Sequence, residues 1–436
     1  MDLSHKIEIF PNNQQKTHLR KAFGCTRLAW NWGLEEWMRQ YKAGEKPTGN
    51  KLALKFNRIK KDQFPFVLEV SSYAVKRPFK DLDNSFSSFF KGVSSHPKFK
   101  KKKENIGSYY LGGNVIRFSD RNENSESFKS VIHNKSLKHQ YLWISRLGWV
   151  KMAQRLRFSG KVKYVVISTK QGRFFASFCC EVSIEEYASL HKPYDETRFE
   201  SIGIDLGIKH TLVTSCGVAI EGPHPDVTRG NRLARKQRKL SKRNHVRSKH
   251  ERIQQSNSNN YRKLGRSVAK EYGKRANIRH DFVNKLTTVL VRHFKHIGIE
   301  RLDINKMMKN KRIANFVFDS SFYEIRRQIE YKSKLYKTKV VKAETYFPSS
   351  KTCSCCGNVK RTLTWNDRIY RCDCCGIVID RDLNASLNLR NLCRIGKIGR
   401  GSSEFTPEDL AALQSFFDRN EIATSKVETG NQHGLF

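Results

Sequence analysis

Two closely spaced pairs of cysteines are the clearest candidate metal site in the sequence. Each pair encloses two residues and is followed by a glycine, a spacing typical of the two knuckles of a zinc ribbon. The ligand set that this spacing predicts is Cys353, Cys356, Cys372 and Cys375. Four thiolates leave no position for water or substrate, so we expect one structural Zn²⁺. Cys355 and Cys374 offer neighbouring sulfurs, and redox-active thiols are the alternative interpretation.

Acidic residues at the ends of apolar strands form a second candidate site. Asp205 follows Ser-Ile-Gly-Ile, Glu300 follows His-Ile-Gly-Ile, and Asp382 lies in Ile-Asp-Arg-Asp-Leu-Asn-Ala. A single carboxylate at such a position is usually a capping or turn residue. Three together suit phosphodiester hydrolysis through two Mg²⁺ ions about 3.5–4 Å apart, because hard oxygen ligands must converge there. Asp380 competes with Asp382 for the third role, since both would share one face if they lay in a strand.

The net charge of the chain indicates which class of partner it binds. It has 436 residues with 83 Lys and Arg against 41 Asp and Glu, a formal net charge of +42. Such an excess calls for a polyanion, and no apolar run is long enough to span a bilayer. Asp2 and Glu8 stand where a signal peptide would be basic and apolar. We therefore expect an intracellular nucleic-acid protein with no membrane partner.

The elements that must position these residues fall into two halves. A strand over 4–10 precedes a helical region from Gln14 to about Lys91, broken at Gly44–Gly49 and at Phe64-Pro65. Short β-rich pieces over 107–185 suit an antiparallel barrel, which the first strand should complete. A buried strand then leads to Asp205, a strongly basic pair of helices covers 229–290, and strands follow at 296–300 and 339–347 with a helix near 319–336 between them.

The whole succession resembles the TnpB family of insertion-sequence proteins, which are relatives of type V CRISPR effectors. The similarity rests on GIDLGIKH, NIRHDFVNKLTTVLV, IGIERLDINKM, the two cysteine knuckles and IDRDLNASLNL. KIEIFPNNQQ, RLAWNWGL, HPKFKKKK and ISRLGWVKM extend it toward the N-terminus, so it covers residues 4–392. The chain departs from the family pattern in the extra cysteine of each knuckle and in Ser386.

This resemblance implies a multidomain α+β fold. It consists of an N-terminal β-barrel (wedge) with a helical insert, followed by an RNase H-like, RuvC-like α/β nuclease domain with an inserted zinc ribbon. The expected divisions are 1–12 (first wedge strand), 13–103 (helical recognition domain), 104–190 (rest of the wedge), 198–347 (first part of the nuclease domain), 348–378 (zinc ribbon), 379–393 (last part of the nuclease domain) and 394–436 (flexible tail). A helix capped by Thr406 is expected within the tail.

The resemblance also implies the activity of an RNA-guided DNA endonuclease of a mobile element. Asp205, Glu300 and Asp382 stand at the family's three catalytic acids and would bind two Mg²⁺. The partners would be a guide RNA and target double-stranded DNA beside a short motif that the protein reads. A compact CRISPR effector using a CRISPR RNA and a nuclease-inactive RNA-guided repressor remain alternatives, as does a classical transposase. A nucleoid-associated place in a prokaryotic cytoplasm would follow.

Basic residues outside the acid site are candidates for phosphate contacts. Most charge runs are solvated linkers or helix faces, but here they belong to a chain with a large basic excess. The candidates are Lys98, Lys100, Lys101 and Lys102, then Arg232, Arg235, Lys236, Lys239, Lys242 and Arg243. Trp30, Trp32 and Trp37 could stack on bases, although their spacing is more typical of core positions.

Overall fold

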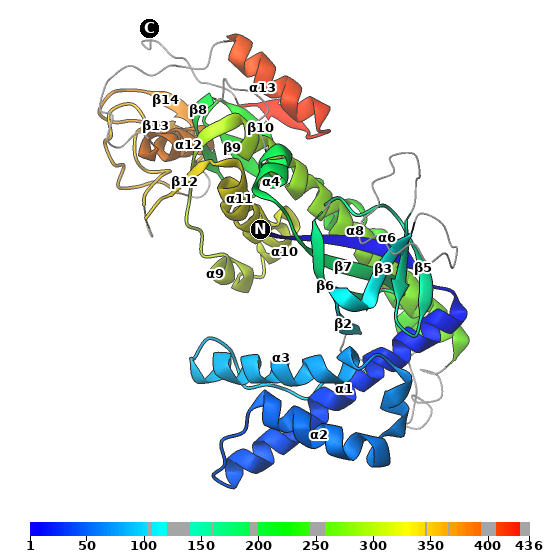
Figure 1. Cartoon of the computed structure of the whole chain (residues 1–436). Coiled ribbons are helices and arrows are strands. Elements are labelled where there is room, and N and C mark those ends of the chain that lie inside the picture. Colours follow the sequence, from blue (N-terminus) through cyan, green and yellow to red (C-terminus); the bar gives the residue numbers. More distant parts are fainter. Residues whose placement is uncertain are drawn as a thin grey trace. The chain divides into compact units, whose positions relative to one another are not determined.

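The structure is a computed structural model that describes residues 1–102, 107–119, 140–158, 160–191, 199–243, 258–344, 347–364, 367–393 and 407–427. It divides into two compact units, Met1–Leu190 and His191–Phe436, which we describe separately (Figure 1). None of the helices in the described ranges is long and apolar enough to cross a membrane.

The first unit begins with a strand and a helical insert, as the sequence predicts. Its helical elements are α1 (Asn13–Lys42), α2 (Gly49–Gln63), the short 3-10 helix η1 (Pro65–Glu69), α3 (Tyr73–Phe90) and α4 (Ile184–Leu190). The start of α1 is a capping box, in which Asn12 and Gln15 each accept a hydrogen bond from the other's backbone N–H. The breaks between the first three helices fall at Gly44–Gly49 and at Phe64-Pro65, so both predicted interruptions are confirmed.

The predicted core role of the tryptophans is confirmed. Trp30 and Trp37 are buried, and Trp32 packs edge-on against Phe56 with ring centroids 5.1 Å apart. Trp37 also stacks on Phe86 at 4.3 Å. These rings therefore hold the helices together and are not free for base stacking.

The strands of the first unit form one antiparallel sheet. They are β1 (Asp2–Phe10), β2 (Ser108–Gly112), β3 (Ile116–Ser119), β4 (Tyr141–Ile144), β5 (Gly148–Met152), β6 (Lys161–Lys170) and β7 (Arg173–Glu181). Their order is β2-β6-β7-β1-β5-β4-β3, so β1 lies in the middle, paired with β7 and β5. The first strand thus joins the later strands in one sheet, as expected.

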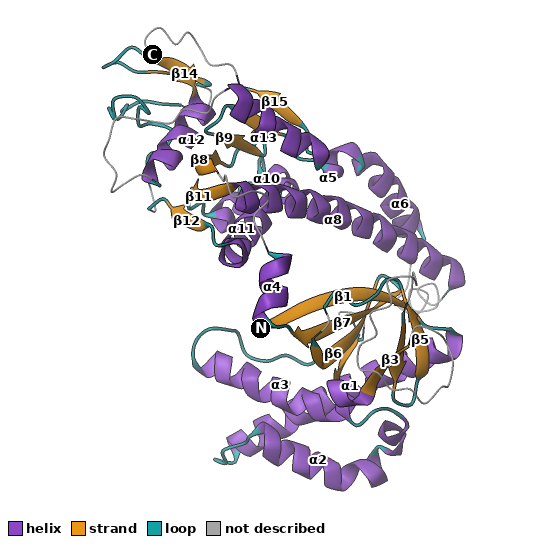
Figure 2. Ribbon diagram, turned by 45° about the horizontal axis from the view of Figure 1, so that its top comes forward, coloured by secondary structure: helices purple, strands orange, loops and turns teal. Residues whose placement is uncertain are grey.

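The predicted barrel is corrected to a curled, open sheet. The edge strands β2 and β3 are joined only by the short helix η2 (Gly113–Val115), which spans at most about 14 Å, whereas a flat seven-stranded sheet would part its edges by about 29 Å. The sheet must therefore curl, as Figure 2 shows. No ladder joins β2 to β3 in the described residues, so closure by hydrogen bonds is not found there.

The second unit is built on a mixed sheet. Its strands are β8 (Phe199–Asp205), β9 (Leu212–Thr214), β10 (Val218–Ile220), β11 (Phe294–Ile299), β12 (Lys339–Lys342) and β15 (Thr424–Lys426), with β13 (Ile369–Arg371) and β14 (Val378–Asp380) in a separate hairpin. The order of the main sheet is β12-β11-β8-β9-β10-β15. β11 runs parallel to both β8 and β12, while β9 and β10 continue antiparallel.

The helices of the second unit pack on this sheet or on one another. They are α5 (Pro225–Thr228), α6 (Gly230–Lys242), α8 (Asn259–His293), α9 (Ile304–Lys309), α10 (Ala314–Ser320), α11 (Phe322–Tyr336), α12 (Arg381–Leu392) and α13 (Pro407–Arg419). The predicted helix near 319–336 is divided at Ser321, whose φ is 59°. The apolar sides of α8 and α11 share one core with β8 and β11, which includes Leu286, Ile297 and Ile325.

The expectation of a flexible tail does not hold for residues 407–427. Strand β15 pairs antiparallel with β10, and Leu413, Phe417 and Ile422 are buried in the core of the second unit. The physical reason is twofold. The apolar side of α13 is buried against the core of the second unit, and β10 offers an edge with which β15 can pair. The predicted helix within the tail is confirmed as α13, whereas its expected cap, Thr406, lies outside the described residues.

Candidate functional site: a cluster of acids beside a cysteine ribbon

The three predicted acids lie at ends of elements in the second unit. Asp205 is the last residue of β8, Glu300 directly follows β11, and Asp382 is the second residue of α12. Because β8 and β11 are adjacent and parallel, Asp205 and Glu300 meet at the same edge of the sheet.

Two glycines bring α12 onto this part of the sheet. Gly203 and Gly298 are directly paired, and each lies two residues before its acid, so glycine and acid share one face. A Cβ on Gly203 would lie 1.9 Å from the carbonyl oxygen of Ser386, and one on Gly298 would lie 2.0 Å from that of Leu389. The helix backbone therefore touches the strands where side chains would otherwise stand.

The close packing of α12 carries Asp382 to the other acids. Asp382 lies four residues before Ser386, about 6 Å along the helix, and Asp205 lies two residues beyond Gly203, about 6.6 Å along the strand. Asp382 Oδ2 is 4.0 Å from the position of a Cβ on Gly207, just past the end of β8. Helix α12 therefore begins where strand β8 ends, and the two elements run in opposite directions.

Burial and mutual repulsion disfavour ionisation in this cluster. Asp205 is 7% exposed, and burial raises its pKa well above the ordinary value, with further contributions from the negative charges of Glu300, Asp382 and Asp380. Burial also raises the pKa of Glu300, which the hydroxyl of Ser349, 3.4 Å from Glu300 Oε1, partly offsets. Negative charge held this close in a buried place suits a divalent cation.

The acids approach one another without forming a single tight cage. In the described ranges, the only set of three or more potential ligand side chains whose atoms all lie within 4.8 Å of one another is the cysteine cluster. The acid oxygens are therefore more widely spaced than the ligands of one ion. The acids around two metal ions about 3.5–4 Å apart need not all lie within 4.8 Å of one another, because an acid that binds only one ion can be further from the ligands of the other.

Asp380 has a capping role. Its Oδ1 accepts hydrogen bonds from the backbone N–H groups of Asp382 (2.8 Å) and Leu383 (3.0 Å), which makes it the N-cap of α12. The strand that contains Asp380 ends there, and Asp382 lies in the helix. Asp380 would compete with Asp382 for the third acid position only if both residues lay in one strand. They do not, so this condition is not met.

Two arginines that the sequence reasoning missed contact Asp382. Arg381 Nε lies 3.4 Å from Asp382 Oδ1, and Arg368 Nη1 lies 3.9 Å from Asp382 Oδ2. Arg381 stands beside the acid in the sequence and could have been noticed. Arg368 belongs to the ribbon segment, and only folding brings it near.

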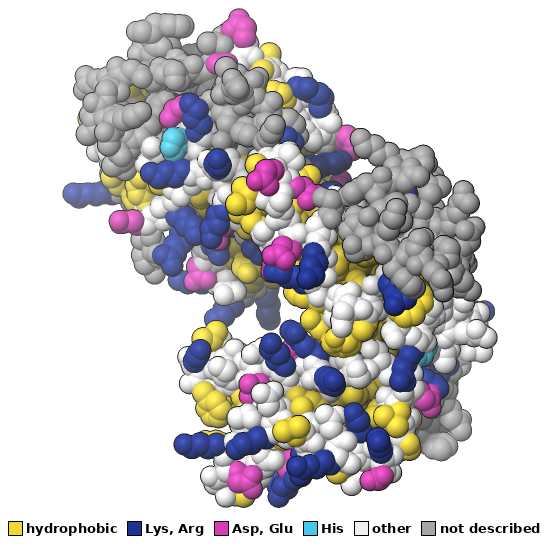
Figure 3. Space-filling view, viewed as in Figure 1, with side chains coloured by type: hydrophobic (Ala, Val, Ile, Leu, Met, Phe, Trp, Pro, Cys, Tyr) yellow, Lys and Arg dark blue, Asp and Glu magenta, His cyan; other side chains and the backbone are white. Residues whose placement is uncertain are grey.

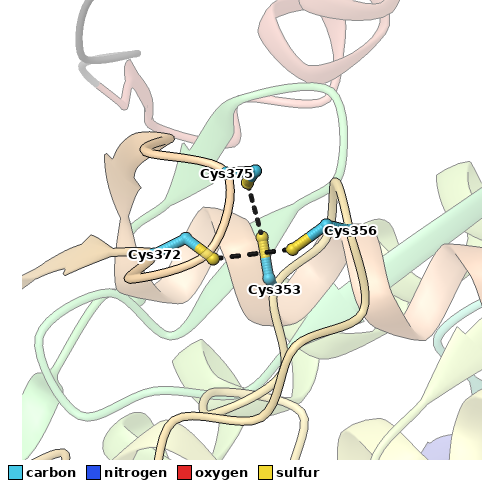
Figure 4. Close-up of side chains that lie close together, drawn as sticks. All are labelled: Cys353, Cys356, Cys372 and Cys375. Carbon is cyan, nitrogen blue, oxygen red and sulfur yellow. Dashed lines mark hydrogen bonds between the residues drawn. The ribbon is translucent and has the colours of Figure 1, made fainter.

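The four predicted cysteines come together at the ribbon (Figure 4). Cys353 Sγ lies 3.6 Å from Cys375 Sγ, and Cys356 Sγ lies 3.5 Å from Cys372 Sγ. Tetrahedral Zn–S bonds of about 2.3 Å require sulfurs about 3.8 Å apart, so the set fits Zn²⁺ closely. Cys355 and Cys374 do not belong to this set, as the spacing predicts.

The two knuckles repeat the same backbone pattern. The N–H groups of Gly357 and Gly376 donate to the carbonyls of Cys353 and Cys372, at 3.0 and 3.1 Å. Both glycines have positive φ, 78° and 73°, which explains why glycine follows each pair. The sequence spacing therefore reports a structural duplication, and the cluster could hold a structural zinc.

The basic side chains that were predicted to contact phosphates differ in whether they already interact with other side chains of the protein. Lys236 Nζ lies 2.9 Å from the buried carboxylate of Glu271, which also pairs with Arg232 at 3.5 Å. Lys100 Nζ lies 3.7 Å from the ring centroid of Trp30 and is partly buried. These three basic side chains therefore have structural partners.

The remaining candidates have exposed side chains. They are Lys98, Lys101, Lys102, Arg235, Lys239, Lys242 and Arg243. Lys and Arg side chains are spread over the face drawn in Figure 3.

An aromatic and basic groove lies on the first unit. Tyr110 is flanked by Tyr73 and Tyr164, at centroid distances of 6.0 and 5.1 Å, and the guanidinium of Arg77 lies 4.5 Å from its ring centroid. Two adjoining hollows of about 550 and 600 Å³ share Tyr73 and Tyr110. Their basic lining residues are Lys76, Arg77, Lys80, Lys161 and Lys163. The sequence reasoning did not identify this groove, because its parts come from separate elements.

Taken with the fold, these features define a class: an α/β protein with a buried acid cluster at parallel strand ends and a four-cysteine ribbon. Family descriptions match three parts of the chain, "Helix-turn-helix domain" over residues 1–46, "Probable transposase" over 177–311 and "Cas12f1-like, TNB domain" over 322–389. A "TnpB-like protein" of Acanthamoeba polyphaga mimivirus is 32% identical over 30% of this chain and 26% of its own length. These matches agree with the resemblance of the chain to the TnpB family.

Two curated bacterial proteins are similar over most of their length. Both are named "Putative RNA-guided DNA endonuclease". The Streptomyces pristinaespiralis protein is 29% identical, covering 88% of this chain and 87% of its own, and Escherichia coli InsQ is 24% identical, covering 88% and 90%. A solved structure of CasPhi-2 (Cas12j) bound to crRNA matches 90% of this chain and 98% of that chain at 9% identity, with a TM-score of 0.45. That score is too low to establish a shared fold.

Proposed function

We propose that this protein is an RNA-guided DNA endonuclease of a mobile element, acting through a two-metal site on an RNase H-like, RuvC-like unit. The observation that carries the proposal is the meeting of Asp205, Glu300 and Asp382 at one edge of the second sheet, two of them at the ends of parallel strands. The names of the relatives with similar length support the same activity. The first unit is proposed as the wedge and recognition part.

The acids are the groups that would hold two Mg²⁺ ions. Bound Mg²⁺ would supply the charge that activates water and stabilises the leaving oxygen of a phosphodiester. Asp205 lies deepest and is influenced by the charges of both other acids, so it would be a ligand of the bound cations. Ser349 contacts Glu300, and the two arginines contact Asp382.

Nucleic acid is the partner that best matches the charge of +42. The groove around Tyr110 combines ring faces, a stacked guanidinium and lysines, the composition of a surface that contacts bases and phosphates. We propose guide RNA and target DNA as the ligands, with sequence chosen by base pairing. The site of action would then be the interior of the cell, with the chromosome.

Cleavage by the purified protein–RNA complex tests the proposal. Asp205→Ala should abolish Mg²⁺-dependent cleavage of guide-matched DNA while RNA binding persists, because the acid is buried at the end of β8 and is not a proposed RNA contact. Asp62→Ala, an exposed acid in α2, is the control and should cleave normally. Full activity of Asp205→Ala would refute the metal assignment.

Sequencing the RNA that purifies with the protein separates the alternatives. A transcript from the end of a mobile element supports the proposal, whereas a CRISPR RNA indicates a compact CRISPR effector. A guided complex that binds DNA but never cuts it indicates a repressor. Absence of any bound RNA would refute guidance itself.

A further inference from the structure

One short segment links the cysteine ribbon to the acid cluster. Residues 348–354 run from the end of the β12 region into the first knuckle and contain both Ser349 and Cys353. Ser349 is 3% exposed, and its hydroxyl faces Glu300 Oε1 at 3.4 Å. The segment therefore touches a metal-binding acid at one end and a zinc ligand at the other.

Two buried asparagines of α12 fasten this segment. Asn388 Nδ2 donates to the carbonyl oxygens of Ser349 (2.8 Å) and Thr352 (2.6 Å). Asn384 Nδ2 donates to Thr352 as well (2.7 Å), and its Oδ1 accepts from the N–H of Ser354 at 2.9 Å. Both side chains are at most 5% exposed, so these bonds replace hydration that is absent there.

The helix that fastens the segment also carries the third acid. Asn384 lies two residues after Asp382 and Asn388 one turn further along α12. A continuous set of hydrogen bonds thus runs from α12 through Asn388 and Ser349 to Glu300. Asp382 and Glu300 are connected through it, although 82 residues separate them in the sequence.

We propose that Ser349 is a positioning residue for Glu300, and that Asn384 and Asn388 hold Ser349 in place by binding its segment to α12. The inference rests on the proposed function, since it assigns a role within that metal site. A hydroxyl that donates to one oxygen of a carboxylate fixes the orientation of that carboxylate toward a cation.

Ser349→Ala is the decisive variant, because it removes the hydroxyl but keeps the carbonyl that Asn388 binds. Binding of Mn²⁺ to the protein–RNA complex without DNA, followed by electron paramagnetic resonance, should weaken about tenfold, the range seen when supports of metal ligands are removed. Zinc content, measured by mass spectrometry, should stay at the wild-type value.

Two further variants separate positioning from general stability. Ser349→Thr retains a hydroxyl and should restore Mn²⁺ affinity. Ser333→Ala removes another buried serine hydroxyl, one that donates to the carbonyl of Glu330 in α11, and should leave Mn²⁺ binding unchanged.

The outcomes are distinct from those of the proposed function. If the wild type binds Mn²⁺ and cleaves DNA while Ser349→Ala matches it in Mn²⁺ affinity, the positioning role is overturned and the nuclease proposal stands. If the wild type neither binds Mn²⁺ nor cleaves, the proposed function fails first. Weakened binding in Ser349→Ala, with rescue in Ser349→Thr, supports the inference.

Discussion

Gly203 and Gly298 are paired across β8 and β11, and the backbone of α12 lies against both. Their missing side chains leave the space that the helix occupies. Asp382 lies in the first turn of the same helix, so the position of one acid depends on two glycines that have no chemistry of their own. The architecture of the acid cluster is therefore a matter of backbone packing.

Gly203→Ala should destabilise the second unit. Its Cβ would meet the Ser386 carbonyl at 1.9 Å, and backbone on both sides cannot move as a flexible side chain can. We expect a loss of about 3 kcal/mol in the free energy of unfolding, the upper range for overpacking. Denaturant titration measures it. Gly265→Ala, in α8 with open space around it, should be neutral or stabilise by up to about 1 kcal/mol, and equal losses in both variants would contradict this packing.

The metal-free protein should lose stability as the pH rises. Burial raises the pKa of Asp205 and of Glu300 in the folded state, so their contribution is present below the ordinary carboxyl range and is lost as the pH rises through the raised values. In chelator, Asp205→Asn should melt higher than wild type at pH 8, and the difference should shrink toward pH 4. Added Mg²⁺ should raise the melting temperature of the wild type relative to that of Asp205→Asn. A thermal melt of Asp205→Asn below that of wild type at pH 8 would contradict the prediction.

The ribbon should lose its zinc only when a member of the set of four is changed. Cys372→Ser should reduce bound zinc from one ion per chain to none and lower the melting temperature, because its buried sulfur is one of the four that could hold the ion. Cys374→Ser, the exposed neighbour outside the set, should retain zinc. Elemental analysis reads both, and zinc retained in Cys372→Ser would mean that a neighbouring sulfur replaces it.

Asp380 and Asp382 should respond differently to the same conservative change. Asparagine caps a helix about as well as aspartate, so Asp380→Asn should keep both stability and cleavage. Asp380→Ala should cost about 1 kcal/mol through loss of the cap. Asp382→Asn should abolish cleavage, because an amide oxygen carries no charge to bind the cation. Cleavage assays and unfolding curves on the three variants test this, and loss of cleavage in Asp380→Asn alone would exchange the two roles.

Within α6, neighbouring lysines should act in different ways. Lys242→Gln should weaken RNA binding and reduce the slope of log affinity against log salt by about 0.7–0.9, since its exposed side chain has no ion-pair partner in the described part of the chain. Lys236→Gln should chiefly lower the melting temperature by leaving Glu271 less well paired. RNA titrations at several salt concentrations, with melts alongside, measure both effects. Equal salt slopes in Lys242→Gln and wild type would exclude that phosphate contact.

Much of this fold is predictable because it depends on short-range patterns. The first strand, the helices broken at Gly44–Gly49 and Phe64-Pro65, and the strands that lead to Asp205 and Glu300 all follow from periodicity and breaker residues. The barrel and the flexible tail were predicted less well. Closure of the first sheet into a barrel depends on whether its edge strands β2 and β3 pair. The place of β15 depends on a free edge of β10, some 200 residues earlier in the chain.

The site divides in the same way. The amino-acid sequence by itself determined the set of four cysteines and the strand-end acids, because knuckle spacing and apolar runs are local properties of the chain. Only the tertiary structure decided that Asp380 caps a helix, that Arg368 reaches Asp382, and that Ser349 faces Glu300. Those contacts join residues distant in sequence, and their geometry exists only after α12 has packed on the glycines of the sheet.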